Sequence, residues 1–336
     1  MKKILVTGGL GFIGSHTVVA LQNEGFEVLI IDNLSNSRIE VLDGITAITN
    51  KKPAFFKIDL KNKSLVKDFF ATHKIDGVIH FAASKAVGES VNKPLKYYEN
   101  NVSTLLYLLQ EMNAQKVNNL IFSSSCTVYG QADELPITEK APIKPAESPY
   151  GNTKQIGEEI ITDTTKVSDL NAIALRYFNP IGGHDSILIG ELPIGVPQNL
   201  IPFVTQTAAG IRESLSVFGD DYDTHDGTAV RDYIHVVDLA KAHIIAMKRL
   251  LARNNKSQME FFNIGTGKGS SVLDVINAFE KATNKKLNYK IVPRRAGDIT
   301  SAYADTTLAN TALGWKSELT LEDALRSAWL WQEKIS

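Results

Sequence analysis

The chain has 336 residues, of which 43% are hydrophobic and 22% are charged, an ordinary globular composition with enough apolar material for a large core. Its 36 Lys and Arg residues nearly balance 37 Asp and Glu residues, giving a formal net charge of −1. Near-neutrality argues against nucleic acid or an anionic membrane as a partner, because both need a basic surface. The single cysteine, Cys126, excludes an internal disulfide and a cysteine-rich metal site.

The first residues do not resemble an export signal, because Met1, Lys2 and Lys3 are followed by only three apolar residues before Thr7. The sequence contains no apolar run of about 18 residues, so no transmembrane helix is predicted. A single thiol fits a reducing compartment. We therefore expect a soluble, cytoplasmic protein.

Short apolar strands alternate with helical segments in the first half of the chain. Strands are predicted at residues 3–7, 27–31, 54–58, 77–81, 120–123 and 172–177, and helices at residues 12–23, 65–72 and 94–114. The strands are compact and apolar, as strands buried on both faces are. This alternation predicts a doubly wound (Rossmann) α/β fold, with a parallel sheet and helices on both of its faces.

The composition changes after Asn179 and Pro180. Up to about residue 232 the chain is rich in Gly, Pro, Asp and Asn, with one helix near residues 200–210, as in loops that build a substrate domain. Strands are predicted again at residues 233–237 and 261–264, with helices at residues 238–251 and 320–332. We therefore predict a Rossmann domain of residues 1–179, its sheet rejoined by about residues 233–264, and a smaller C-terminal substrate-binding domain of residues 180–232 and 265–336.

Residues 7–14, TGGLGFIG, carry the glycine pattern of a dinucleotide phosphate loop. Gly8 and Gly11 follow a predicted strand and Gly14 lies in the first turn of the predicted helix, where the backbone approaches a pyrophosphate at the helix N-terminus. Asp32 ends the next strand, where a carboxylate bonds ribose hydroxyls and repels a 2′-phosphate, so NAD is favoured over NADP. The alternative is a structural turn followed by an N-capping aspartate.

Ser148 and Pro149 form an N-cap signal for a helix that places Tyr150 and Lys154 four residues apart on one face. A phenol has an unperturbed pKa of about 10. A neighbouring ammonium and a positively charged nicotinamide ring stabilise the phenolate, which makes Tyr150 a candidate base. The spacing alone also fits a solvated surface pair, but its place after the fifth strand of a dinucleotide fold favours the base.

The predicted fifth strand runs into Ser123, Ser124 and Ser125. A hydroxyl at the carboxyl end of such a strand points into the crevice where ligands bind in doubly wound sheets. Ser125 is therefore a candidate to bond a sugar hydroxyl or the reacting oxygen. The alternative is a serine-rich turn whose hydroxyls bond its own backbone.

The whole chain, residues 1–336, resembles the extended short-chain dehydrogenase/reductase family, and within it the nucleotide-sugar 4-epimerases. The resemblance rests on the segments TGGLGFIGSH, IDNLSNS, VIHFAASKAVGESV, YYENNV, IFSSSCTVYG, SPYGNTK, LRYFNP, RDYIHVVDLA and NIGTGKGSSVLDVI. It implies an NAD-dependent isomerase that interconverts UDP-galactose and UDP-glucose through a transient 4-keto sugar and bound NAD. It also implies a homodimer, formed through helices that correspond here to residues 94–114 and 151–166.

The resemblance assigns the site residue by residue. In that family a serine and a tyrosine act on the 4-hydroxyl of the sugar and a lysine holds the nicotinamide ribose, and these match Ser125, Tyr150 and Lys154. The implied cofactor contacts are Gly8, Gly11, Phe12, Ile13, Gly14, Asp32, Asn33, Leu34, Ser35, Asn36, Ser37, Asp59, Leu60, Phe81, Ala82, Ala83, Ser84, Lys85, Asn100, Ser123, Tyr150, Lys154, Tyr177 and Phe178. The implied contacts to the UDP-hexose are Lys85, Ser125, Thr127, Tyr150, Asn179, Asn199, Leu200, Ser216, Val217, Phe218, Arg231, Tyr233, Arg295, Asp298 and Ala302.

The physical chemistry of the residues agrees with the nucleotide-sugar assignment, because a diphosphate needs fixed cations and the guanidinium fork suits it well. Without the resemblance, Arg231 beside Asp232 and the pair Arg294 and Arg295 also fit solvated surface charges. The seven histidines show no metal-ligand spacing, so no metal is predicted and they are interpreted as core or surface residues: His16, His73, His80, His184, His225, His235 and His243. Cys126 is interpreted as a small buried residue.

Three alternatives on the same fold remain, and the first is another NAD-dependent nucleotide-sugar epimerase. A nucleotide-sugar 4,6-dehydratase needs an acid–base pair, usually Asp-Glu after the hydroxyl residue at this strand end, but here those positions hold Cys126 and Thr127. Dehydration is therefore disfavoured, and so is decarboxylation. A catalytically silent NAD-binding regulator is disfavoured by the intact set of Ser125, Tyr150 and Lys154.

One position bears on substrate size. The segment at residues 297–303 aligns with a family stretch near the 2-substituent of the sugar, and Ala302 stands where some members have a tyrosine. Members with a small residue there tend also to accept N-acetylhexosamines. The resemblance therefore implies activity on UDP-N-acetylgalactosamine and UDP-N-acetylglucosamine as well, unless neighbouring side chains fill the space.

Overall fold

The computed structural model describes residues 1–295 and 298–336, and Gly297, at the start of the segment that leads to Ala302, lies outside the described residues. A seven-stranded sheet has the order β11-β6-β5-β4-β1-β2-β3, and all neighbouring strands are parallel. Its strands are β1 (Lys3–Thr7), β2 (Glu27–Asp32), β3 (Ala54–Lys57), β4 (Gly77–His80), β5 (Asn119–Ser125), β6 (Asn171–Tyr177) and β11 (Met259–Ile264). This confirms the predicted doubly wound α/β fold.

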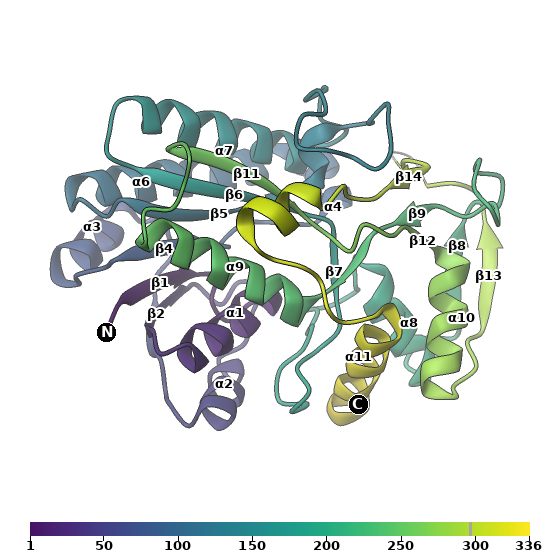
Figure 1. The fold of residues 1–336 in the computed structure, drawn as a ribbon. Coiled ribbons are helices and arrows are strands. Elements are labelled where there is room, and N and C mark those ends of the chain that lie inside the picture. Colours follow the sequence, from purple (N-terminus) through teal and green to yellow (C-terminus); the bar gives the residue numbers. More distant parts are fainter. Residues whose placement is uncertain (296–297) are drawn as a thin grey trace.

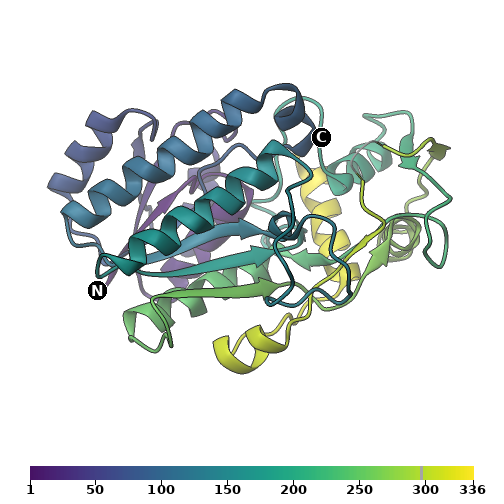
Figure 2. The same ribbon diagram turned by 90° about the horizontal axis from the view of Figure 1, so that it is seen from above.

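Helices cover both faces of this sheet (Figures 1 and 2). One face packs against α1 (Phe12–Asn23), α2 (Val41–Thr49) and α9 (Val236–Leu251), through a core that includes Val18, Leu42 and Leu239. The other face packs against α3 (Lys63–Thr72), α6 (Thr104–Ala114) and α7 (Pro149–Lys166), through Phe69, Leu108 and Ile161. The strands therefore bury both faces, which explains why they are almost continuously apolar.

The strand order reverses between β1 and β4, since β2 and β3 continue on one side of β1 and β4 lies on the other. The crevice outside the carboxyl ends of such strands is where ligands bind in doubly wound sheets. The segments that follow β1, β2 and β4 at this end of the sheet hold most of the residues that the sequence assigns to the cofactor.

A second part of the chain lies beyond the carboxyl ends of the strands (Figure 1). Its three small sheets pair β10 (Tyr233–His235) with β7 (Asn179–Ile181), β9 (Val230–Arg231) with β12 (Ser270–Ser271) and β14 (Ser301–Ala302), and β8 (Leu215–Phe218) with β13 (Tyr289–Val292). The helices α8 (Leu200–Ala208), α10 (Val272–Thr283) and α11 (Leu321–Ile335) pack around Val204, Phe279 and Leu325. This part has its own core beside the ligand end of the large sheet.

Two predicted elements differ from the structure. The strand predicted at residues 233–237 is shorter and does not rejoin the large sheet, because β10 pairs with β7, which follows β6 in the chain. The large sheet is extended beside β6 by β11. The helix predicted at residues 94–114 is divided into α5 (Pro94–Tyr98), a π-helical turn (Glu99–Ser103) and α6. Within the turn, Asn101 bonds both backbone groups of Ser84, which fixes the turn against the segment after β4.

The elements that were not predicted from the sequence include the amphipathic helices α2, which follows an irregular segment, and α10, which directly follows the two-residue strand β12. Among the residues that the structure describes, we find no helix with the length and apolarity needed to cross a membrane.

Candidate active site

The glycine loop between β1 and α1 is packed so closely that it leaves no room for a Cβ atom at Gly8 or Gly14. A Cβ atom on Gly14 would lie 2.2 Å from the carbonyl oxygen of Gly8, and one on Gly8 would lie 2.9 Å from the backbone nitrogen of Ala82. Gly8 also has φ of +69°, a left-handed conformation that favours glycine. The loop thus brings bare backbone to the N-terminus of α1, which suits it to a pyrophosphate.

Asp32, at the end of β2, is fixed by the glycine loop and by the turn that follows it. The backbone N–H of Leu10 donates to Oδ2 (3.1 Å), and Leu34 N–H (2.9 Å) and the Ser37 hydroxyl (2.8 Å) donate to Oδ1. Asn33 Nδ2 donates to the carboxylate of Asp59 (3.3 Å), which follows β3. Asn33, which is also assigned to the cofactor, therefore links the turn after β2 to the segment after β3.

The segment after β4 contains the next group of predicted cofactor residues. Asn100 Nδ2 donates to the Ser84 hydroxyl (3.3 Å), so two of these residues are in contact. The Lys85 ammonium donates to Glu191 Oε1 (3.3 Å), and Asn199 Nδ2 donates to the same oxygen (2.8 Å). Glu191 thus joins Lys85 to Asn199, one predicted contact from each part of the molecule.

The start of α7 has the local structure that the sequence predicts. The Gly151 N–H donates to the Ser148 hydroxyl (3.1 Å), which caps the helix, and Pro149 is its first residue. The Lys154 ammonium donates to the carbonyl of Ser123 (2.7 Å) and lies 5.8 Å from the centre of the Tyr150 ring. The Lys154 ammonium is therefore fixed against the carboxyl end of β5, with the Tyr150 ring beside it.

Burial dominates the electrostatics of this group. It raises the pKa of the Tyr150 phenol well above its usual range; the nearby Tyr177 adds to the rise and the Ser125 hydroxyl opposes it. Burial lowers the pKa of Lys154 to about 8, opposed by the carboxylate of Glu158. The chain alone therefore keeps the phenol protonated near neutral pH, and additional positive charge beside it is needed to favour the phenolate.

Tyr177 and Ser123, both assigned to the cofactor, are hydrogen-bonded to each other through their hydroxyls. Burial raises the pKa of Tyr177 to about 12. The neighbouring Phe178 is buried and follows directly at the end of β6. Within the described residues, the hydroxyl of Thr127 is buried and has no hydrogen-bond partner, which makes it available to a bound molecule.

Two of the residues assigned to the nucleotide sugar, Arg231 and Arg295, contact the carboxylate of Asp298. Arg295 donates through two nitrogens to this carboxylate (2.8 and 3.2 Å), and a guanidinium nitrogen of Arg231 lies 4.0 Å from it. Arg295 also lies 5.5 Å from the centre of the Phe218 ring. Ala302 in β14 pairs with Arg231 in β9, which brings the predicted size-determining residue beside the predicted diphosphate residue.

The surroundings of Arg231 and Arg294 differ in their exposure to solvent. Asp232 is fully buried and accepts hydrogen bonds from the backbone of Thr266, Gly267 and Ala304, so the reading of Arg231 and Asp232 as solvated charges is wrong. Arg294 is exposed and pairs with Asp221 (2.7 Å), as a surface charge does.

Comparison with known proteins identifies the family. The family profile described as GDP-mannose 4,6 dehydratase matches residues 5–328. The UDP-glucose 4-epimerase of Haemophilus influenzae is 50% identical over 331 residues, which cover 98% of this chain and 97% of that protein. The chain belongs to the UDP-glucose 4-epimerase family.

Solved structures of this family have the same fold as the epimerase described here. The structure from Stenotrophomonas maltophila, with bound NAD and formylated UDP-arabinopyranose, has a TM-score of 0.96 and 46% identity, and the match covers 100% of this chain and 99% of that one. The structure from Bifidobacterium longum, in complex with NAD+ and UDP, has a TM-score of 0.95 and 47% identity, covering 99% and 98%. The resemblance inferred from the sequence motifs is confirmed.

Glu191 contacts two predicted site residues but was not itself predicted from the sequence. It lies in the loop-rich segment between β7 and α8, and no local motif marks it, although its backbone carbonyl also accepts a hydrogen bond from Trp331 of α11 (2.8 Å). Only the pairing with Lys85 and Asn199 across the two parts of the enzyme reveals that it contacts the site.

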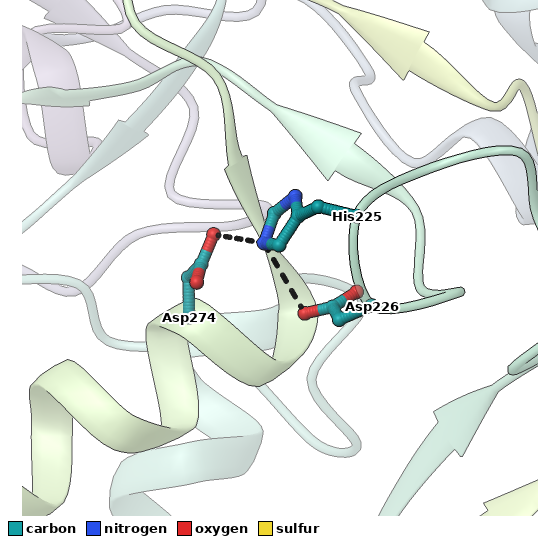
Figure 3. A group of neighbouring side chains, drawn as sticks. All are labelled: His225, Asp226 and Asp274. Atoms are coloured by element: carbon teal, nitrogen blue, oxygen red, sulfur yellow. Dashed lines mark ion pairs between the residues drawn. The ribbon is translucent and has the colours of Figure 1, made fainter.

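One group of three side chains in residues 1–295 and 298–336 has the spacing of a metal site: His225, Asp226 and Asp274 (Figure 3). His225 Nε2 lies 3.2 Å from Asp274 Oδ2 and 3.6 Å from Asp226 Oδ2. Both carboxylates already accept hydrogen bonds, Asp226 from the Thr228 N–H (2.9 Å) and Asp274 from the Ser271 N–H (2.9 Å). We interpret the group as ion pairs around the capped N-terminus of α10, and the absence of a metal stays a prediction.

Proposed function

We propose that the enzyme interconverts UDP-galactose and UDP-glucose by inverting carbon 4 of the sugar. The observation that carries the proposal is the placement of Tyr150 and Lys154 at the start of α7, with the Lys154 ammonium bonded to the strand that ends in Ser125. This group lies at the same end of the sheet as the glycine loop after β1.

The residues present fit NAD. The loop at residues 8–14 accepts no Cβ at Gly8 or Gly14, and it ends at the N-terminus of a 12-residue helix. Asp32, which the backbone of this loop orients, would hold the adenine ribose, and Lys154 would hold the nicotinamide ribose. NAD, when bound, supplies the chemistry of taking a hydride from carbon 4 of the sugar and returning it.

Tyr150 acts as the base that takes the proton from the 4-hydroxyl, and the Ser125 hydroxyl holds the oxygen at that carbon. Lys154 supplies positive charge beside the phenol ring, which favours the phenolate that the buried phenol otherwise resists. After the 4-keto sugar has turned to present its other face, the Tyr150 phenol returns its proton to the oxygen at carbon 4. The tyrosine therefore ends the cycle in the state in which it began.

The nucleotide half of the substrate is held more firmly than the sugar. Arg231 and Arg295 supply the fixed cations for the diphosphate, and Asp298 orients both of them. We assign Asn179, Asn199, Leu200, Ser216, Val217, Phe218 and Tyr233 to the remaining contacts with the sugar, uracil or ribose. Anchoring at the nucleotide leaves the 4-keto sugar able to turn about its link to the diphosphate.

A 4,6-dehydratase is the nearest alternative, and the matching family profile carries a dehydratase description. Elimination of the 6-hydroxyl needs an acid–base pair beside the sugar. The two residues after Ser125 are Cys126 and Thr127, and burial raises the pKa of the Cys126 thiol to about 12, so neither supplies it. The epimerase reaction needs no such pair.

Proton NMR of the purified protein with UDP-galactose, without added NAD, tests the proposal. Formation of UDP-glucose supports both epimerisation and a resident cofactor. Conversion only after NAD is supplied would support the epimerase reaction but would refute the proposal that NAD stays bound to the purified protein. Loss of the 6-hydroxyl would favour the dehydratase, and no reaction with NAD present would refute the assignment. Reduction of bound NAD by a nucleotide sugar, followed by absorbance, would exclude a silent regulator.

We propose that the enzyme also epimerises UDP-N-acetylgalactosamine and UDP-N-acetylglucosamine, because Ala302 is small. Ala302 is 3% exposed and packs in a cluster with Val128 and Phe178, so a larger side chain there must displace a neighbour or enter the sugar site. An Ala302→Tyr variant should lose about 10–200-fold of kcat/KM on the acetylated substrates and keep it on the plain ones. Ala302→Ser is the matched control, and equal losses on both substrate classes would contradict the proposal.

We further propose a homodimer formed through the helices at residues 94–114 and α7. Val91 in α4 (Val87–Asn92) and Leu95 in α5 are 59% and 80% exposed, and Leu106 in α6 is 38% exposed, so this surface carries apolar side chains in contact with solvent. Light scattering should give twice the chain mass, and Leu95→Asp should give a monomer. Ile211→Asp, which changes an exposed residue of the other part, is the control; a monomeric wild-type protein would refute the dimer.

A further inference from the structure

A buried ion pair lies one helical turn beyond Lys154. Arg176 in β6 donates to both carboxylate oxygens of Glu158 in α7, through Nε (2.9 Å) and a terminal nitrogen (2.6 Å), and the Ser124 hydroxyl donates to the same carboxylate (2.5 Å). The side chains of Glu158 and Arg176 are only 8% and 5% exposed. A buried pair is costly to desolvate and is weak evidence for stability by itself, so its position calls for an explanation.

The pair extends toward the sugar segment through a chain of hydrogen bonds. Arg176 donates to the Tyr129 hydroxyl (3.0 Å), which donates to Asn263 Oδ1 (2.6 Å), and Asn263 Nδ2 donates to the carbonyl of Ile137 (2.8 Å). The Ile137 N–H donates to the carbonyl of Tyr303 (2.9 Å), next to Ala302. The network therefore joins the helix that carries Tyr150 to the strand segment that carries Ala302.

Glu158 follows Lys154 by four residues on α7, so the two side chains are neighbours on one helix face. Consecutive residues of β5 bond to them: the Ser123 carbonyl accepts from Lys154, and the Ser124 hydroxyl donates to Glu158. Other titratable groups near Lys154 are Tyr150 in α7, His80 in β4 and Tyr177 in β6, whose hydroxyl bonds that of Ser123. Burial lowers the pKa of His80 to about 3, so Glu158 is the negative charge near the ammonium.

We propose that Glu158 and Arg176 form a positioning pair, which fixes α7 on β5 and β6 and keeps the Lys154 ammonium charged beside Tyr150. The inference rests on the proposed roles of these two residues. Arg176 bonds both carboxylate oxygens of Glu158, and Glu158 in turn opposes the loss of the Lys154 proton, which burial favours. Neither member of the pair needs to touch substrate or cofactor.

The double variant Glu158→Gln with Arg176→Met tests the proposal, because it removes both charges and leaves no unpaired one in the interior. Without Glu158 the Lys154 pKa falls, so the alkaline limb of the kcat profile should shift to lower pH by about one unit, with the KM for UDP-galactose within about twofold of the wild type. At pH values above the alkaline limbs of both the wild type and the double variant, the kcat of the double variant should be about tenfold below that of the wild type. Glu158→Gln alone should shift the limb further, because the charge of Arg176 is then uncompensated.

A second buried pair in the same sheet gives a matched control. Arg249 in α9 donates to both carboxylate oxygens of Glu260 in β11 (2.7 and 2.9 Å), with side chains 12% and 9% exposed, and neither residue belongs to the proposed site. Glu260→Gln with Arg249→Met should change thermal stability but leave the pH profile unchanged.

Three outcomes would overturn the positioning role. The first is a pH profile of kcat in the Glu158→Gln/Arg176→Met variant that matches the wild type. The second is an equal shift of the alkaline limb in the Glu260→Gln/Arg249→Met control. A double variant that fails to fold while the control pair folds would assign Glu158 and Arg176 to stability alone. Absence of turnover in the wild-type enzyme would instead refute the proposed function, so the two failures are distinguishable.

Discussion

A Tyr150→Phe variant is expected to lose about 10²–10⁴-fold of kcat, the range that a general base contributes, while it folds and keeps its affinity for UDP. The substitution removes one oxygen atom and leaves the ring, so it opens no large cavity in the interior. The proposed base is lost, whereas the contacts of Lys154 with Ser123 remain. The measurement is UDP-galactose turnover, alongside thermal unfolding and UDP binding.

Tyr107→Phe is the matched control, because Tyr107 lies in α6, where its ring contacts Lys63 rather than the site. It should change kcat less than about twofold, as surface substitutions away from a site usually do. Near-normal turnover in Tyr150→Phe would show that another group takes the proton. A loss in both variants would point to the fold rather than to the base.

Features that depend on neighbouring residues in the chain could be predicted from the sequence. The glycine loop is one, because Gly8, Gly11 and Gly14 follow β1 directly and lead into α1. The start of α7 is another, since the Ser148 cap, Pro149 and the four-residue spacing of Tyr150 and Lys154 all lie within one short segment. In both cases the motif and the structure it forms lie in fewer than ten residues, and the doubly wound alternation then brings them to the same end of the sheet.

Features that depend on pairing between distant residues could not be predicted in this way. Glu191 lies 106 residues from Lys85 along the chain, and neither residue indicates the other. The pairing of β10 with β7 instead of the large sheet is similar, because an apolar strand signal does not specify its neighbour. The motifs therefore locate the reaction, whereas the side chains that orient the reacting groups become visible only in the folded chain.

A Gly14→Ala variant is expected to lose most of its resident NAD, which the proposed function assigns to the loop that Gly14 closes. The added Cβ would lie 2.2 Å from the Gly8 carbonyl oxygen and 2.9 Å from the Gly9 Cα, and backbone atoms cannot rotate away as a side chain does. Alanine is favoured over glycine within a helix by about 1 kcal/mol. Overpacking costs about 1–3 kcal/mol, so steric crowding should prevail and displace the loop.

The measurement is NAD released per chain on denaturation, together with the Tm and with turnover before and after NAD is added. We expect the bound NAD to fall at least about tenfold, the consequence of losing 1.4 kcal/mol of binding free energy, and the Tm to fall by about 2–6 °C. Gly88→Ala is the matched control, because α4 leaves open space around a Cβ at Gly88 and the added methyl meets nothing within 4 Å. If Gly14→Ala retained as much NAD as Gly88→Ala, the close approach of backbone to backbone in this loop would not be what holds the pyrophosphate, and Asp32 and the segment after β4 would have to carry the affinity instead.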